Sequence, residues 1–206
     1  MDSVYSRVAE NNVVWHNGFV NRVDRNEAYG HKSGLIWFTG LSSSGKSTIA
    51  HAFEKRLFEE GIKCYVLDGD NIRHGLNADL GFSENDKREN LRRTVEVARL
   101  MVDAGLIVLA AFVSPFRRDR QYIRERFKND NFLEVYVRCS VDECARRVPK
   151  GYYEKTRAGI IKGYTGVDSP YEEPENPDLI LDTEKMDKES SISLLYETLM
   201  NRGWIG

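Results

Sequence analysis

A phosphate-binding loop after the first predicted strand constrains the fold more than any other feature of the chain. The loop and the residue that follows it read Gly40-Leu41-Ser42-Ser43-Ser44-Gly45-Lys46-Ser47-Thr48 and fit the pattern G-x-x-x-x-G-K-[ST]. Residues 34–39 are mainly apolar, as in a buried strand, and residues 47–60 carry apolar side chains at helical spacing. The loop therefore joins a strand to a helix, which is the context that phosphate binding requires.

The residue types in this loop suit a nucleoside triphosphate. Gly40 and Gly45 permit a tight turn that presents backbone N–H groups to phosphate oxygens. Lys46 can reach the outer phosphates, and the Ser47 hydroxyl can coordinate Mg²⁺. A chance Gly-Lys-Ser turn is the alternative, and the flanking strand and helix argue against it. The loop alone does not decide the reaction, because ATPases, GTPases and small-molecule kinases share it.

Composition favours one α/β domain without a nucleic-acid or membrane partner. The chain has 206 residues, of which 41% are hydrophobic, and a net charge of −2, which argues against general nucleic-acid binding. No apolar run reaches about 18 residues, and the N-terminus lacks a secretory signal pattern, so we expect a cytoplasmic protein. Cys64, Cys139 and Cys144 lack metal-site spacing and are expected to be buried free thiols.

Predicted strands and helices alternate along the chain. We expect strands at 34–39, 63–67, 106–113, 132–137 and 178–181. We expect helices at 47–60, 86–104, 117–127, 141–147 and 188–201. This alternation predicts a three-layer α/β domain of the P-loop kinase type, with a central parallel sheet and an active site at the carboxyl ends of its strands. The strand 106–113 is almost wholly apolar and is expected at the centre of the sheet.

Two segments lie outside this alternation. Residues 1–32 are polar and irregular, which predicts an N-terminal arm that packs on the domain 33–206 or on a second subunit. Residues from about 148 to 177 mix cations, glycine and tyrosine. A long irregular stretch of this composition favours a mobile lid over anionic ligands, and a solvated loop is the alternative.

Polar and aromatic residues gather where the predicted strands end. The ends of the first three strands carry Lys46, Asp68 and Ser114. On the helix 86–104, Asn90 and Arg93 are three positions apart and are expected to converge on one ligand. This layout is typical of a kinase whose acceptor is anionic. Phe82, which lies between these segments, offers an aromatic ring on which a base can stack.

These segments resemble the adenylylsulfate kinase family, which uses ATP to phosphorylate the 3′-hydroxyl of adenosine 5′-phosphosulfate. Besides the phosphate loop, the matching stretches are DGDNIRHGLN (68–77), GFS (81–83), FVSPFR (112–117), KGYTGVDSPYE (162–172), PENP (174–177) and LDT (181–183). The resemblance runs from about Val14 to Thr183. It implies a magnesium-dependent, ATP-binding transferase of sulfate assimilation that acts on adenylylsulfate. The expected partners are a second copy of the chain, as a homodimer, and an ATP sulfurylase in functional association.

The resemblance also implies roles for individual residues. Lys46 and Asp68 are the expected catalytic residues, Ser47 and Asp68 the expected metal ligands, and Arg147 and Pro149 the expected adenine contacts. Asp68 either orients the acceptor hydroxyl or holds the water shell of the metal. The expected acceptor site consists of Asp70, Arg73, Phe82, Lys87, Asn90, Arg93, Val113, Ser114, Lys162 and Tyr164.

Several of these residues have a second interpretation. Asp70 could instead cap a turn, Arg73 could form a surface ion pair, and Phe82 could pack in the core. The family resemblance marks Ser114 as a candidate phosphoserine intermediate. Direct in-line transfer needs no such intermediate, so we expect Ser114 to position the substrate.

Three positions depart from the family pattern. Ser43 replaces a usual glycine and would be strained if its backbone has a positive φ. Lys87 replaces a usual arginine, which keeps the charge but loses a planar, bidentate grip. Val148 replaces a usual acidic residue at the start of the predicted lid.

Three other functions compete with adenylylsulfate phosphorylation. A nucleoside monophosphate kinase or another P-loop kinase would share the loop and differ in its acceptor. A GTP-dependent switch needs an Asn-Lys-x-Asp motif, and Glu184-Lys185-Met186-Asp187 matches it poorly. A non-catalytic nucleotide-binding subunit is disfavoured because Lys46, Ser47 and Asp68 are all present.

Overall fold

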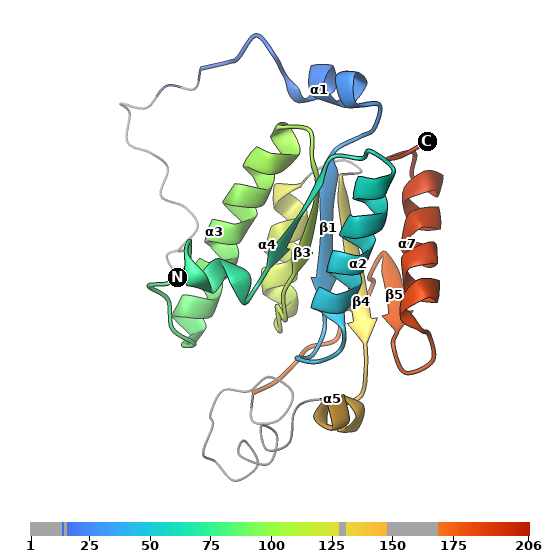
Figure 1. The fold of residues 1–206 in the computed structure, drawn as a ribbon. Coiled ribbons are helices and arrows are strands. Elements are labelled where there is room, and N and C mark those ends of the chain that lie inside the picture. Colours follow the sequence, from blue (N-terminus) through green and yellow to red (C-terminus); the bar gives the residue numbers. More distant parts are fainter. Residues whose placement is uncertain (1–13, 15, 128–130, 148–168) are drawn as a thin grey trace.

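The computed structural model describes residues 14, 16–127, 131–147 and 169–206. Five parallel strands form one sheet in the order β2-β3-β1-β4-β5 (Figure 1). The strands are β1 (Gly34–Thr39), β2 (Cys64–Asp68), β3 (Ile107–Ala111), β4 (Phe132–Arg138) and β5 (Leu179–Asp182). The helices are α1 (Arg22–Tyr29), α2 (Lys46–Glu59), the 3₁₀ turn η1 (Asn71–His74), α3 (Glu84–Asp103), α4 (Arg117–Arg126), α5 (Val141–Arg147) and α7 (Lys188–Asn201).

The sheet is covered by helices on both faces, as the alternation of elements predicts. Successive residues of β1 point to opposite faces, and both faces are buried. Ile36 and Phe38 pack with α2 and α7, whereas Leu35 and Trp37 pack with α3 and α4. Each of these side chains, fully buried, contributes about 1.5–3 kcal/mol of transfer free energy. The fold class predicted from the sequence is therefore confirmed, with element bounds within about two residues of the expected ones.

Two expectations about the fold are wrong. The middle strand of the sheet is β1, and the apolar strand expected at the centre, β3, lies between β2 and β1. Both are interior strands, and burial on two faces gives both the same apolar composition. The segment 1–32 is not irregular throughout, because residues 22–29 form α1.

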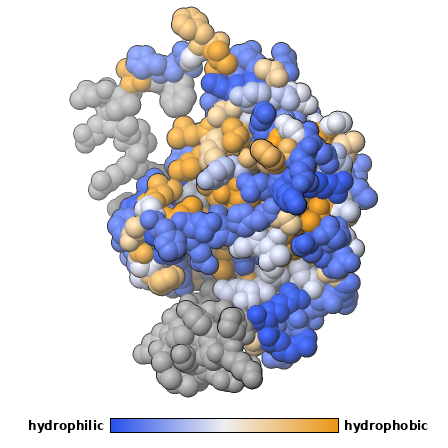
Figure 2. Space-filling model, viewed as in Figure 1, coloured by the Kyte–Doolittle hydropathy of each residue, from blue (hydrophilic) through white to orange (hydrophobic). Residues whose placement is uncertain are grey.

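A capping box explains α1, which has no buried residue to stabilise it. The Asn21 side chain accepts hydrogen bonds from the N–H groups of Val23 and Asp24, and the Asp24 carboxylate accepts one from the Asn21 N–H over 2.8 Å. The helix lies at the end of the sheet opposite the carboxyl ends of the strands (Figure 1). Phe19 and Val20, which precede α1, are exposed apolar residues. Figure 2 shows apolar residues interspersed with hydrophilic ones over this face of the molecule.

Candidate active site

The phosphate loop leaves β1 and enters α2 through two glycines that no larger residue could replace easily. Gly40 and Gly45 have φ of +151° and +105°. A Cβ at Gly40 would lie 2.4 Å from the carbonyl oxygen of Val137 on β4, so the loop touches the neighbouring strand. Because α2 begins at Lys46, its first N–H groups and the positive end of its dipole lie at the loop. The loop therefore has the geometry of an anion site.

Ser43 has a positive φ of 66°, as its position in the family pattern suggested. Ser114 is the other non-glycine residue with a positive φ, at 39°, among the residues that the structure describes. Such a backbone costs a residue with a Cβ of order 1–3 kcal/mol. Both residues belong to the predicted site.

Lys46 is a buried cation in this loop, only 7% exposed. Its Nζ donates to the carbonyl of Leu41 over 2.7 Å. Burial lowers the pKa of the Lys46 ammonium to about 8, and the nearby carboxylates of Asp68 and Asp70 partly offset this effect. A phosphate at the loop would offset it further, so this lysine is suited to bind an anion.

Asp68 ends β2 and carries an unsatisfied oxygen. Its Oδ1 accepts hydrogen bonds from the N–H groups of Asp70 and Asn71 over 2.9 and 3.4 Å. Its Oδ2 is buried and has no hydrogen-bond partner. A buried carboxylate oxygen without a partner is costly and indicates a ligand, here an acceptor hydroxyl or a water bound to Mg²⁺. The 3₁₀ turn η1 shows no side-chain capping bond from Asp70, which disfavours the interpretation of Asp70 as a cap.

Oxygen donors suited to magnesium lie at this edge of the sheet. The Ser47 hydroxyl is on an exposed residue in the first turn of α2, and Asp68 supplies a carboxylate. In the described part of the chain, no group of three or more His, Cys, Asp or Glu side chains could hold a metal by itself. Ser47 and Asp68 therefore fit Mg²⁺. Proteins that bind nucleotides usually hold this ion through one or two side-chain oxygens, and phosphate and water supply the other ligands.

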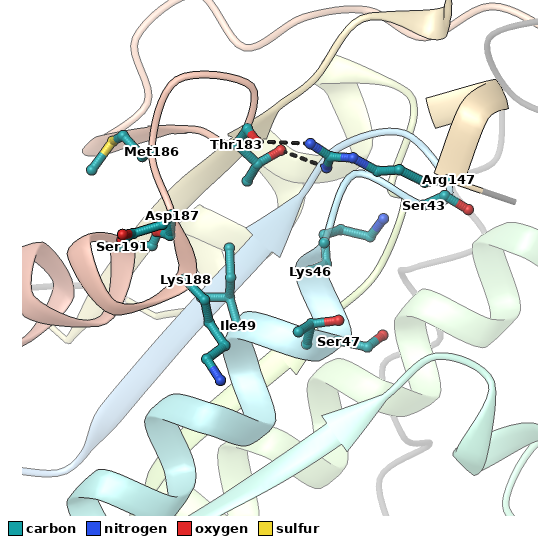
Figure 3. A pocket seen from close by; sticks show the side chains of 12 residues that line it. Ser43, Lys46, Ser47, Ile49, Arg147, Thr183, Met186, Asp187, Lys188 and Ser191 are labelled. Carbon is teal, nitrogen blue, oxygen red and sulfur yellow. Dashed lines mark hydrogen bonds between the residues drawn. The ribbon is translucent and has the colours of Figure 1, made fainter. Parts of the chain in front are cut away.

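A pocket of about 530 Å³ opens beside the phosphate loop (Figure 3). Arg147 crosses its edge, and its guanidinium donates to the hydroxyl and the carbonyl of Thr183 over 3.0 and 2.7 Å. The Thr183 hydroxyl in turn donates to the carbonyl of Ser44 over 2.9 Å. The structure thus places the predicted residue Arg147 next to the loop.

Part of the pocket lining was missed by reasoning from the sequence. Besides Ile49 of α2, a core position of that helix, the missed residues outside the loop and α2 are Thr183, Met186, Asp187, Lys188 and Ser191. Only Thr183 carried a signal, as the last residue of the stretch LDT that resembles the family. The others belong to a turn and to the start of α7, and nothing in their spacing indicates a pocket.

On the predicted acceptor side of the site, the half-buried Arg73 packs against the exposed Phe82. The Arg73 guanidinium lies 4.4 Å from the centre of the Phe82 ring and donates to the carbonyls of Leu80 and Gly81, each over 3.1 Å. The Phe82 ring is 70% exposed, which rules out the core-packing interpretation. An exposed ring held by a cation is suited to stack on a base.

Asn90 and Arg93 are each bonded to other side chains of the protein, and their predicted convergence on one ligand stays a prediction. Asn90 is buried and accepts a hydrogen bond from the Asn77 side chain over 2.9 Å. Arg93 donates to both carboxylate oxygens of Asp79, over 2.6 and 2.9 Å, and to Glu89 over 2.8 Å. The sequence pattern did not show that two carboxylates would neutralise this arginine.

Ser114 is buried at the end of β3, beside the strand that leads to the phosphate loop. Its hydroxyl accepts from the Trp37 indole over 3.0 Å and donates to the Thr39 hydroxyl over 2.9 Å. The Thr39 hydroxyl donates to the carbonyl of Val113 over 2.9 Å. The Ser114 hydroxyl and the Val113 carbonyl are therefore both bonded to the last residue of β1.

Several predicted residues fall outside the described part of the chain. They are Val148, Pro149, Lys162 and Tyr164, together with residues 148–168 of the predicted lid. Lys87 is described and lies on the first turns of α3, half-buried.

The cysteines agree with the expectation of free thiols. Cys139 and Cys144 are buried and pack with Leu41 of the phosphate loop, while Cys64 is half-buried. Burial raises the pKa of the Cys144 thiol to about 12, so this thiol stays neutral at physiological pH. Nothing in this arrangement suggests a reactive thiolate.

Comparison with known proteins gives one consistent family. Residues 32–182 match the family model described as Adenylylsulphate kinase. A probable adenylyl-sulfate kinase of Halalkalibacterium halodurans is 55% identical, covering 92% of this chain and 91% of that protein. An adenylyl-sulfate kinase of Geotalea uraniireducens is 52% identical, covering 95% of each.

A solved structure agrees with these relatives. The Mycobacterium tuberculosis APS kinase in complex with AMPPNP and APS superposes with a TM-score of 0.75 and 45% identity. The match covers 83% of this chain and 99% of that one. Within the described residues, none of the helices has the length and apolar character needed to span a bilayer.

Proposed function

Because the chain belongs to the adenylylsulfate kinase family, we propose that it transfers the γ-phosphoryl group of ATP to the 3′-hydroxyl of adenosine 5′-phosphosulfate. The products are 3′-phosphoadenylyl sulfate and ADP, which makes this a step of sulfate activation. One observation carries the proposal: a complete phosphate loop, with its buried Lys46, lies beside an unpartnered buried oxygen of Asp68. The Mycobacterium tuberculosis relative, with AMPPNP and APS bound, supports ATP and adenylylsulfate as the two substrates.

In this mechanism Lys46 and the loop N–H groups hold the outer phosphates and stabilise the charge that develops on the transferred group. Ser47 and Asp68 would hold Mg²⁺, which would supply positive charge to offset that of the phosphate groups. The free oxygen of Asp68 also suits an acceptor hydroxyl, which it would orient for in-line attack.

The two nucleotides occupy different parts of the site. Arg147, at the pocket edge, and Pro149 would contact the adenine of ATP. The exposed ring of Phe82, backed by Arg73, would stack on the adenine of adenylylsulfate. The remaining acceptor-site residues proposed by resemblance are Asp70, Lys87, Asn90, Arg93, Val113, Ser114, Lys162 and Tyr164.

The assembly and location of the protein are also proposals. Exposed apolar residues near α1, such as Phe19 and Val20, would be covered in a homodimer. Free thiols fit a reducing, cytoplasmic compartment. A functional association with ATP sulfurylase would supply adenylylsulfate directly.

A coupled ADP-release assay with a panel of acceptors tests the proposed function. The panel holds adenylylsulfate, AMP and a sugar acid, each with Mg²⁺ and ATP. We expect ADP release with adenylylsulfate far above that with the other acceptors. Equal release with AMP would instead indicate a nucleoside monophosphate kinase.

A further inference from the structure

Arg120 is a buried cation that the proposed chemistry does not use. It lies on α4, is 3% exposed, and its Nε donates to Glu134 Oε1 on β4 over 3.0 Å. The desolvation of two buried charges can exceed their mutual attraction, so a buried ion pair is weak evidence for a role in stability. The role of Arg120 has to be sought in its hydrogen bonds to groups other than Glu134.

The other two guanidinium nitrogens reach the carbonyls of two separate segments. Nη1 donates to the carbonyl of Ser114 over 2.6 Å, in the loop where Ser114 has a positive φ. Nη2 donates to the carbonyl of Glu172 over 2.5 Å. The Glu172 N–H donates to the carbonyl of Pro115 over 2.9 Å, so the two segments are also bonded to each other. One rigid fork of donors thus fixes β4, the loop after β3 and residues 171–172 together.

The same two segments meet at Thr39, the residue that precedes the phosphate loop. The Thr39 hydroxyl has one proton, which it donates to the carbonyl of Val113. It accepts from the Ser114 hydroxyl over 2.9 Å and lies 3.0 Å from the Tyr171 hydroxyl, which must then be a donor. Burial raises the pKa of Tyr171 to about 12, so its phenol keeps that proton at neutral pH.

We propose that Arg120 is a positioning residue for phosphoryl transfer, an inference that rests on the proposed function. Arg120 holds the Ser114 loop and the Tyr171–Glu172 pair in register with the end of β1, and hence with the phosphate loop. The cation acts through these two segments and is not itself placed at the reacting atoms. Because catalysis depends on alignment, displacement of the acceptor-side loop by about 1 Å can cost roughly a hundredfold in rate.

The test compares Arg120→Lys with Arg124→Lys. A lysine at position 120 keeps the charge beside Glu134, but its single nitrogen cannot serve three diverging acceptors. Arg124 is a matched control on the same helix: it pairs with Glu134 over 3.1 Å and with Asp178 over 2.7 Å, away from Ser114 and Glu172.

We expect Arg120→Lys to lower kcat about ten- to a hundredfold and to raise the KM for adenylylsulfate, with the KM for ATP within about twofold of wild type. Arg124→Lys should keep all three constants within about twofold. A wild-type kcat in Arg120→Lys, an equal rise in both KM values, or the same loss in Arg124→Lys would overturn the inference. A wild-type protein without activity on adenylylsulfate would instead refute the proposed function.

A second variant decides the matter if Arg120→Lys does not fold. Tyr171→Phe removes the hydroxyl that bonds to Thr39 and keeps the ring. We expect a smaller loss in kcat of about three- to tenfold at an unchanged melting temperature. Unchanged kcat in this variant would show that the register of the segment does not matter for transfer.

Discussion

The Ser114 hydroxyl donates a hydrogen bond to the Thr39 hydroxyl over 2.9 Å, from a residue that is only 3% exposed. The same oxygen accepts a hydrogen bond from Trp37 over 3.0 Å. A nucleophile must present an open oxygen to the γ-phosphate, and this oxygen is enclosed and engaged on both sides. The geometry therefore favours direct transfer over a phosphoserine intermediate.

We accordingly predict that Ser114→Ala retains turnover. The loss should stay below about tenfold, since the variant removes one positioning hydrogen bond and no reacting group. Intact-mass measurement of the wild type incubated with Mg²⁺ and ATP alone should show no added phosphate. Phosphate on Ser114 that forms as fast as turnover, with an inactive alanine variant, would establish the covalent route instead.

Lys46→Ala should reduce transfer by roughly a thousandfold, because a cation at the developing phosphoryl charge is worth several kcal/mol. The fold should survive, and circular dichroism can verify that. Lys55→Ala is the matched control, since Lys55 lies on the same helix with its side chain in solvent. Activity of Lys46→Ala within tenfold of wild type would remove this lysine from the mechanism.

The lowered pKa of Lys46 also predicts a dependence of stability on pH. Its folded value of about 8 lies below the ordinary value of about 10.4, so the unfolded chain binds more protons between these two pH values. The cost of burying the charge is therefore fully present below pH 8 and is relieved as the pH rises towards 10.4.

Lys46→Met removes this titration and isolates its effect. We expect the variant to be more stable than wild type at pH 7, by on the order of 2–3 kcal/mol, and most of that gain to disappear at pH 10. Denaturant unfolding at the two pH values measures the difference. A gain that does not change with pH would mean that Lys46 titrates normally in the folded protein.

Arg73→Ala should raise the KM for adenylylsulfate far more than that for ATP. The guanidinium holds the Phe82 ring and is placed to form charge-assisted bonds with an anionic acceptor. Steady-state kinetics with each substrate varied in turn measures both constants. Arg126→Ala, which removes a surface ion pair with Glu96, serves as the control. If the KM for ATP rises and the KM for adenylylsulfate does not, the two nucleotide sites have been assigned the wrong way round.

Ser43→Gly should stabilise the protein slightly. A residue with a Cβ pays about 1–2 kcal/mol at a left-handed backbone such as φ 66°, whereas glycine costs about 0.5–1 kcal/mol in chain entropy. The net gain should be about 0.5–1 kcal/mol by denaturant unfolding. A loss of stability on this substitution would mean that the Ser43 side chain makes a favourable contact that outweighs the strain.

Local signals made most of the fold predictable. Apolar runs and helical spacing located β1 and α7 at their observed bounds, because each of these elements buries several of its own residues. The helix α1 was missed because a capping box, and not an apolar face, specifies it. The middle position of the sheet was assigned to β3 and belongs to β1. Composition distinguishes interior strands from edge strands, but it does not show which interior strand lies in the middle.

Site residues could be predicted where the local sequence alone determines their position. The two glycines and Lys46 lie in the strand-to-helix turn that the loop pattern predicts, and Asp68 lies at the carboxyl end of β2. Ser43 has the positive φ that a usual glycine position suggests. Residues that depend on distant partners were not predictable. Arg93 is neutralised by Asp79, and Arg120 acquires its contacts from β4 and from residue 172, far away in the sequence.

The position of the transferred phosphate tests the central claim most directly. The product formed from adenylylsulfate and ATP can be isolated and examined by ³¹P NMR and mass spectrometry. We predict one new phosphomonoester coupled to the 3′ hydrogen of the ribose, with the phosphosulfate group intact. Phosphate on another oxygen, loss of the sulfate, or ATP hydrolysis to free phosphate without a phosphorylated nucleotide would contradict the account.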